Sequence, residues 1–338
     1  MKKVFFISVL YILSIACSTH NHADKADPVK YMNTITANEL KMHLTIVASD
    51  EMEGRDTGTE GQKKAGRYLI SQYKKDQITF PKGASDYYQR VPAEFMNQKS
   101  GGNLNDSENI WAFIEGSEKP NEIVVISAHY DHVGIKNGQV YNGADDDGSG
   151  TVALLEIAQA FETAKKEGHG PKRSILILHM TGEEHGLFGS EYYSQHPIFP
   201  LANTITDINI DMIGRRDEKH AKSNNYIYLI GSDYLSSDLY KICEEANNKY
   251  NHLEIDYQYN DRNDPNRFYY RSDHYNFAKN GIPSVFLFNG VHADYHQASD
   301  EVEKIEFDAL EKRARYAFTI AWELANRDKR PVVDKSGN

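Results

Sequence analysis

The stretch VVISAHYDHVGIKNGQVYNGADDDGSG, Val124–Gly150, decides what kind of fold the chain can adopt. Its start belongs to a run of apolar and β-branched residues, 123–128, which is typical of a strand covered on both faces. His129 follows where that strand should end, and ligands of open α/β sheets bind at the carboxyl ends of the strands. The pattern therefore predicts a buried strand that delivers His129 to the edge of a sheet.

An acidic run, Asp145-Asp146-Asp147, closes the same stretch just ahead of a helix expected at about 149–163. Three adjacent carboxylates repel one another, so the arrangement is unfavourable unless water or a cation offsets the charge. We therefore interpret the segment as the start of a two-metal hydrolytic site.

The rest of the chain alternates between expected strands and helices. This alternation predicts an α/β fold, a three-layer α/β/α sandwich with a mixed, mostly parallel central sheet. No internal repeat or low-complexity block interrupts 33–328, so a single domain is expected over that range. The expected strands are 87–96, 109–115, 123–128, 174–180, 205–211, 226–230 and 284–288, and the expected helices are 36–47, 60–75, 149–163, 188–195, 235–250 and 306–326.

The overall charge argues against a nucleic-acid partner. The chain has 338 residues, of which 26% are charged, and its net charge of −11 leaves no basic stripe to face a phosphate backbone. A hydrophobic content of 40% is ordinary for a globular protein. We expect peptide substrates and no protein partner.

The first residues predict export. MKKVFFISVLYILSIAC, residues 1–17, places two lysines before an apolar run that is too short to span a bilayer. Ending at Cys17, it resembles a bacterial lipoprotein signal, so we expect a lipid on Cys17 as the only membrane contact; a plain cleaved signal is the alternative. Residues 18–32 are predicted to form a flexible tether and 329–338 a disordered tail. Since only Cys243 then remains, no intrachain disulfide is expected.

Further carboxylates and imidazoles lie just past other expected strands, on the sheet edge where α/β active sites form. Taken singly, each has an ordinary structural explanation, as a core histidine, a helix start or a helix cap. Their shared placement is what points to a metal site. The four further positions are Glu183, Glu184, Asp211 and His296, and they share this edge with His129 and Asp146.

Five segments in order carry a family resemblance: HYDH at 129–132, GADDDGSG at 143–150, EEHGLFGS at 183–190, NIDMIG at 209–214 and YHQASD at 295–300. They resemble the di-zinc aminopeptidases, metallopeptidase family twenty-eight, and the resemblance covers most of the chain. It implies a mixed, mainly parallel sheet flanked by helices, and two zinc ions per chain bridged by one aspartate and a water or hydroxide. Other divalent transition metals remain open, because availability also decides occupancy.

The resemblance also implies roles for single residues. Glu183 matches the general base, Asp131 the acid that orients His129, and Tyr295 a tyrosine that helps polarise the scissile carbonyl. Asp145 stands where many relatives have Asn, and the spacing to the following Gly-Ser-Gly assigns the bridge to the next carboxylate. The implied metal ligands are His129, Asp146, Glu184, Asp211 and His296.

The leading hypothesis is a metal-dependent aminopeptidase that removes N-terminal residues from peptides in the cell envelope. A glutaminyl cyclase on the same scaffold is the runner-up, although those relatives place Trp where this chain has Tyr295. A carboxypeptidase that cuts acidic peptides and a non-catalytic peptide-binding lipoprotein are further alternatives. The complete set of ligands and base argues against the last.

Four other residues have weaker assignments. Arg55, in a turn-rich loop, is expected to be a solvated charge, and Asp273, in a Ser-Asp-His segment that also matches the family, is expected to be structural. Nothing in the sequence places Arg267 or Arg271.

Overall fold

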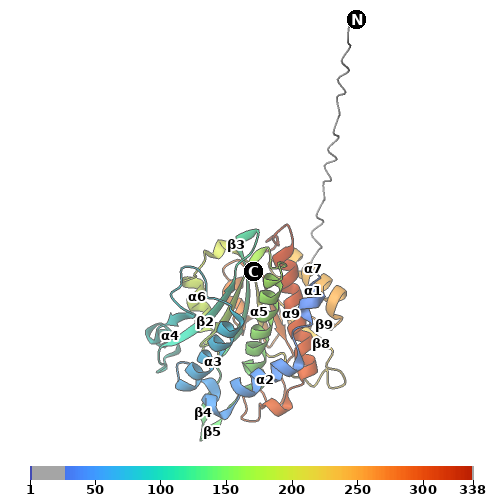
Figure 1. Ribbon diagram of the computed structural model, residues 1–338. Coiled ribbons are helices and arrows are strands. Elements are labelled where there is room, and N and C mark those ends of the chain that lie inside the picture. Colours follow the sequence, from blue (N-terminus) through green and yellow to red (C-terminus); the bar gives the residue numbers. More distant parts are fainter. Residues whose placement is uncertain (2–26, 337–338) are drawn as a thin grey trace.

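The computed structural model describes Met1 and residues 27–336. Its centre is a sheet of eight strands in the order β1-β2-β6-β3-β7-β10-β8-β9 (Figure 1). A separate small hairpin joins β4 to β5. The strands are β1 (Tyr88–Val91), β2 (Ser107–Ile114), β3 (Lys119–His129), β4 (Ile135–Lys136), β5 (Gln139–Val140), β6 (Arg173–Met180), β7 (Thr204–Ile210), β8 (Tyr226–Ile230), β9 (Glu254–Asp256) and β10 (Ser284–Phe288).

The four central strands, β6, β3, β7 and β10, run parallel to one another. The pairs β1–β2, β2–β6 and β8–β10 are antiparallel, and β8–β9 is parallel. The predicted mixed, mostly parallel α/β sheet is therefore confirmed. Because the central strands share one direction, their carboxyl ends meet at one edge of the sheet.

Strand β3 is buried on both faces, as its apolar run predicts. Val124 and Ile126 belong to the large apolar cluster on one side of the sheet, whereas Ile123 and Val125 belong to a cluster on the other side. Burying both faces fixes the register of β3, because a shift by one residue would exchange the two sets. His129 is consequently held at a defined position at the end of the strand.

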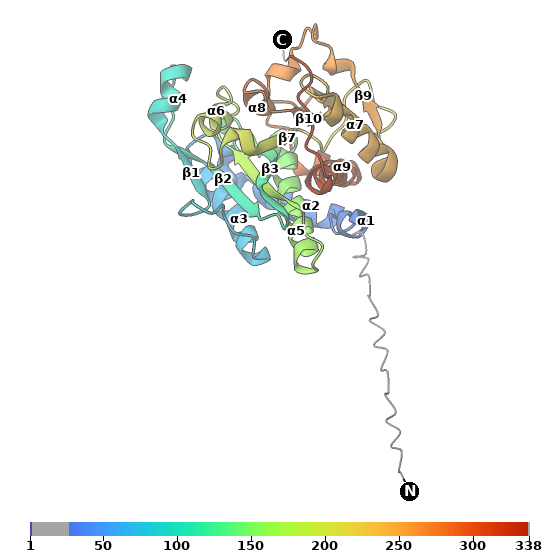
Figure 2. The same cartoon turned by 90° about the horizontal axis from the view of Figure 1, so that it is seen from above.

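Helices cover both faces of the sheet (Figure 2). One layer contributes to the large cluster through α5 and α9, and the other face is covered by α6 and α8. The helices are α1 (Pro28–Met32), α2 (Ala37–Val47), α3 (Glu60–Asp76), α4 (Ala93–Ser100), α5 (Gly150–Lys166), α6 (Phe188–Gln195), α7 (Ser237–Ala246), α8 (His274–Ala278) and α9 (Phe307–Asn326). This is the three-layer arrangement that the alternation of elements predicts.

One element differs from its prediction. The strand expected over 87–96 ends at Val91, and the helix α4 begins two residues later. Pro92 lies between them and has no N–H to donate to a strand ladder, so it ends the strand and stands before the first turn of the helix. The strand prediction rested on the aromatic residues of this segment and gave no weight to its proline.

Both predicted unstructured ends are shorter than expected. The tether predicted over 18–32 is wrong from Pro28 onward, where α1 packs the ring of Tyr31 into the core. The tail predicted over 329–338 is wrong for its described part, because the backbone N–H of Asp334 bonds to Leu235 and its carboxylate accepts from Ser237. The signal predicted over residues 1–17 lies, apart from Met1, outside the described residues. In the described ranges, no helix combines the length and hydropathy that crossing a bilayer requires.

Candidate metal centre

The residues predicted to bind metal lie together at the carboxyl edge of the parallel strands. His129 is the last residue of β3, Asp211 directly follows β7, and Glu184 lies in the loop after β6. Asp146 precedes α5, and His296 lies in the loop after β10. Five segments far apart in the sequence therefore converge on one place.

Asp146 lies between the two predicted histidine ligands. Its Oδ1 is 3.2 Å from His129 Nε2, and its Oδ2 is 3.0 Å from His296 Nε2. His129 Nε2 is 3.6 Å from Asp211 Oδ1, and His296 Nε2 is 3.0 Å from Glu184 Oε2. One oxygen of Asp146 thus faces each half of the site, which is the arrangement that a carboxylate shared by two ions requires.

The two neighbouring aspartates are engaged elsewhere. Asp145 accepts hydrogen bonds from the backbone N–H of Gly214 at 2.6 Å and lies 3.1 Å from His292 Nε2. Asp147 Oδ1 accepts from the backbone N–H groups of Met212 and Gly150. A Cβ at Gly150 would lie 2.5 Å from Asp147 Oδ2, so only glycine allows this approach. Of the three carboxylates, only Asp146 is directed at the converging histidines.

The donor atoms form two groups that could each hold an ion. His129, Glu183 and Asp211 make one group, and His132, Asp146 and Glu184 make the other. His132 Nδ1 lies 2.7 Å from Glu184 Oε1, and Asp146 Oδ2 lies 3.0 Å from His296 Nε2, but these contacts do not have the geometry of hydrogen bonds, and His132 Nε2 has no partner in the described chain. Unpartnered buried donors and acceptors are costly unless a ligand satisfies them, and imidazole with carboxylate is a donor set that zinc accepts. The residues present therefore fit two divalent ions.

Electrostatics distinguish Asp146 from Glu183, the predicted general base. Burial alone would raise the pKa of Asp146, but its contacts with His129 and His296 hold it well below its usual value. Burial raises the pKa of Glu183 well above its usual value, with nearby His129 opposing and Asp211 adding to the shift. Two carboxylates in one site thus have opposite proton affinities, as is common where acid and base roles are divided.

Glu183 is placed differently from the ligand that follows it. Its Oε2 lies 3.9 Å from His129 Nε2, farther than the oxygens of Asp146 and Asp211. Its backbone N–H donates to Asp131 Oδ1 at 3.3 Å, which holds this loop against the end of β3. The carboxylate is consequently close to the cluster without being its nearest oxygen.

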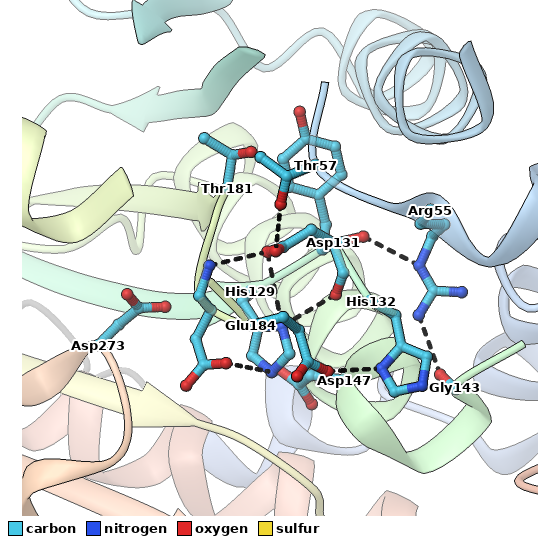
Figure 3. A network of polar contacts seen from close by, with 12 residues as sticks. Arg55, Thr57, His129, Asp131, His132, Gly143, Asp147, Thr181, Glu184 and Asp273 are labelled. Carbon is cyan, nitrogen blue, oxygen red and sulfur yellow. Dashed lines mark hydrogen bonds and ion pairs between the residues drawn. The ribbon is translucent and has the colours of Figure 1, made fainter. Parts of the chain in front are cut away.

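Neighbouring side chains orient the predicted ligands (Figure 3). His129 Nδ1 lies 3.0 Å from the backbone oxygen of Asp131 and 3.7 Å from that residue's carboxylate. The other carboxylate oxygen of Asp131 accepts from Thr57 Oγ1 at 2.8 Å. Ser272 donates to Asp211 Oδ2 at 2.6 Å. Partners of this kind fix ring and carboxylate orientation at metal sites.

Two residues of the site were not identified from the sequence. His132, in the HYDH segment, had no assigned role, yet it is fully buried beside Glu184. Arg55 was expected to be solvated, and this is wrong. It is fully buried and donates to the backbone oxygens of Val47, Tyr130, Asn142 and Gly143, so it joins the loop after β3 to the loop that carries the acidic run (Figure 3).

The structure also places the remaining residues that were named from the sequence. Tyr295 accepts a hydrogen bond from Arg271 Nη2 at 3.3 Å, and burial raises the pKa of the Tyr295 hydroxyl above its usual value. Asp273 is fully buried and accepts from Ser190. Arg267 is exposed, and its guanidinium lies 4.8 Å from the ring centre of Tyr270.

Comparison with known proteins places the chain in one family of peptidases. The family model described as "Peptidase family M28" matches residues 109–321, which is more than half of the chain. The chain is 36% identical over 107 residues to a vacuolar membrane protease of Emericella nidulans, a match that covers 32% of this chain and 10% of that protein. It is 28% identical over 229 residues to a probable leucine aminopeptidase of Trichophyton verrucosum, covering 64% of this chain and 57% of that protein. The chain thus matches only part of either relative's length.

Solved structures share the fold. A zinc aminopeptidase from Bacillus subtilis superimposes with a TM-score of 0.65 at 18% identity, covering 87% of this chain and 96% of that one. A glutaminyl cyclase from Bacteroides thetaiotaomicron does so with a TM-score of 0.64 at 18% identity, covering 85% and 98%. At this identity the likeness establishes the three-layer fold alone.

Proposed function

The chain belongs to peptidase family M28, and from this premise we propose that it is a zinc-dependent aminopeptidase. In this proposal it binds two zinc ions and hydrolyses the first peptide bond of substrates with a free N-terminus. The leucine aminopeptidase among its relatives supports this choice of reaction. The family prediction made from the five motifs is confirmed, whereas the activity and the role of each residue are proposals.

One observation carries the proposal: Asp146 presents one carboxylate oxygen to His129 and the other to His296. This placement supports Asp146 as the shared ligand, with His129 and Asp211 on one side and Glu184 and His296 on the other. His132, 2.7 Å from Glu184, would orient that ligand or take its place as a donor to the second ion.

Two zinc ions, when bound, would supply Lewis acidity and lower the pKa of a coordinated water. The chain itself supplies the base. The carboxylate of Glu183 lies beside the ligand cluster, and burial keeps its pKa high, so Glu183 can take a proton from the attacking water and hand it to the leaving amine.

Tyr295 is proposed to stabilise the oxygen of the scissile carbonyl. Because the phenol oxygen accepts a hydrogen bond from Arg271, its own O–H is free to point elsewhere, and it lines the same pocket as Glu183 and Asp211. Burial keeps the hydroxyl protonated, so it acts as a donor. A donor aimed at a developing negative charge is a common source of catalysis.

A free-amine test separates the candidate reactions. The purified, zinc-loaded protein should release leucine from Leu-p-nitroanilide and leave acetyl-Leu-p-nitroanilide intact, and chelation should abolish the release. Cyclisation of an N-terminal glutamine, with loss of ammonia, would favour the glutaminyl cyclase alternative raised by the shared fold. Hydrolysis of acetylated substrates only would contradict an aminopeptidase.

We also propose that the chain is exported and anchored through a lipid on Cys17. The composition of residues 1–17 supports this. Mass spectrometry of the mature N-terminus would test it. A lipidated cysteine as the first residue supports the anchor, and an unmodified N-terminus contradicts it.

A further inference from the structure

The pocket beside the ligand cluster has an apolar wall and a single cation. It is lined by the predicted ligands Asp146, Asp211 and His296 together with the predicted base Glu183. Its apolar lining includes three phenylalanines, at positions 268, 286 and 288. Arg271 is the one cationic residue of this lining, next to Tyr295.

Arg271 has no carboxylate partner in the described part of the chain, although the pocket around it is acidic. Its hydrogen bond is to the neutral phenol of Tyr295, at 3.3 Å. Its guanidinium lies over the ring of Phe268, 5.0 Å from the ring centre, and the side chain is exposed. Other arginines here are matched: Arg215, for example, pairs with Asp294 at 2.9 Å.

A guanidinium in this setting is suited to a carboxylate. Its N–H groups form a planar fork that matches the two oxygens of a carboxylate, and stacking on an aromatic ring fixes the plane of the fork. The contact with Tyr295 occupies one donor of Arg271 and leaves others for a ligand in the pocket. An occupant that reaches the ligand cluster would therefore also meet the free side of this fork.

We propose that Arg271 forms a carboxylate-binding subsite that selects substrates with a carboxylate close to the scissile bond. The inference rests on the proposed peptidase function and names its substrate class. Two sources present the same chemistry: an acidic side chain on the N-terminal residue, or the free C-terminus of a dipeptide. Both place a carboxylate within a few bonds of the scissile carbonyl.

Matched pairs of substrates test the subsite and distinguish the sources. Glu-p-nitroanilide against Gln-p-nitroanilide reports the side-chain carboxylate, and Leu-Gly against Leu-Gly-amide reports the C-terminal carboxylate. In Arg271→Gln, the ratio of kcat/KM between the charged and neutral members of one pair should fall about 10- to 100-fold, the range for a charge-assisted hydrogen bond. In Arg271→Lys, which keeps the positive charge and loses the planar fork, this ratio should fall less.

Arg267→Gln is the matched control. Arg267 is an exposed arginine four residues earlier that stacks on Tyr270 and does not line the pocket. The Arg267→Gln variant should leave both ratios of kcat/KM unchanged. An equal loss for every substrate in Arg271→Gln would overturn the subsite, because it would mean that Arg271 acts only by holding Tyr295.

A binding measurement separates failure of this inference from failure of the proposed function. Calorimetric titration with glutamate against glutamine needs no turnover, and Leu-Gly against Leu-Gly-amide can be titrated in Glu183→Gln, where hydrolysis is slowed. Tighter binding of one charged member that Arg271→Gln removes supports the subsite even in a protein that hydrolyses nothing. Hydrolysis of Leu-p-nitroanilide with unchanged ratios and unchanged binding in Arg271→Gln overturns the subsite and leaves the peptidase proposal standing.

Discussion

Among the clusters of histidine and carboxylate in the described residues, two are built in opposite ways. The first is the ligand cluster around Asp146. The second, which we call the Asp217 cluster, consists of Asp217, His220, Tyr228 and Asp256. His220 Nδ1 lies 2.8 Å from Asp217 Oδ1, and the Tyr228 hydroxyl donates to Asp217 Oδ2 at 2.6 Å.

The two clusters differ in how many of their polar atoms are paired. Asp217 also accepts from the backbone N–H of His220, and Lys219 pairs with Asp256. No buried side-chain polar atom of Asp217 or His220 lacks a hydrogen bond in the described chain, whereas His132, Asp146 and Glu184 each contain one or more that make only ion-pair contacts or none. Residue type is similar in both clusters. Unpaired donor atoms that converge distinguish the place where a cation is expected.

Replacing an aspartate by alanine should therefore remove metal from the ligand cluster but leave metal binding unchanged when it is made in the Asp217 cluster. Asp146→Ala removes the oxygen shared by both halves of the site, so it should abolish tight binding of both zinc ions and with it the activity. Inductively coupled plasma mass spectrometry of the desalted protein checks this. If the variant still carries two ions per chain, the bridging carboxylate has been misassigned.

Removing the base should separate chemistry from metal binding. Glu183→Gln should retain both ions and lower kcat by about 10²- to 10⁴-fold, because it loses the proton acceptor without losing a shared ligand. Steady-state kinetics on Leu-p-nitroanilide, with metal content measured on the same sample, provides the test. Loss of an ion would instead place Glu183 among the ligands, as its proximity to His129 and Asp211 allows.

His132 tests how much the atoms around Glu184 matter. His132→Ala should weaken zinc binding by about 10- to 100-fold, the range for a residue that orients a ligand. Competition with a chromophoric chelator measures this affinity. A matched control is His220→Ala in the Asp217 cluster, which should leave zinc affinity unchanged; equal weakening in both variants would remove the distinction between the clusters.

Another buried histidine, His179, sharpens the comparison because the side-chain hydrogen bond described for it is with a neutral phenol, that of Tyr73. Burial lowers the pKa of His179 to about 3 in the folded chain. The unfolded chain takes up this proton below its ordinary pKa of about 6.5, so the free energy of unfolding should fall as pH decreases through that value, by about 2 kcal/mol at pH 5. Urea unfolding at pH 7 and pH 5 should show a smaller pH difference in His179→Gln than in the parent chain. An equal difference would contradict the assignment.

The smallest effect on metal is expected at Asp217. Asp217→Ala should keep both zinc ions and full activity, and should lower the free energy of unfolding by about 1–3 kcal/mol because His220 and Tyr228 lose their acceptor. Chemical denaturation and metal analysis of the same sample check both statements. A loss of zinc in this variant would show that the two clusters are coupled.

The sequence predicts those parts of this site that depend on local pattern. The apolar run of β3 fixes both the strand and the position of His129, and the order of the five motifs identifies the family and the fold. The family and the fold are confirmed, whereas the ligand and base roles of single residues remain predictions. What the pattern could not supply depends on contacts across the fold.

Arg55 illustrates this limit. Its acceptors on Tyr130 and Gly143 lie 75 and 88 positions away in the chain, so no local signal marks the arginine as buried. His132 is one residue from the predicted Asp131, yet its nearness to Glu184 arises only when β3 and β6 pair. The strand predicted over 87–96 is too long for a simpler reason. Its aromatic residues favour a strand, and this signal outweighed that of Pro92, which ends it.

The zinc content of the purified wild-type protein tests the central claim most directly. After loading with excess zinc and removal of free ions, the account predicts two zinc ions per chain and a higher thermal unfolding temperature than that of the chelated protein. A chain that stays metal-free under these conditions, with an unfolding temperature that chelation does not change, would contradict it.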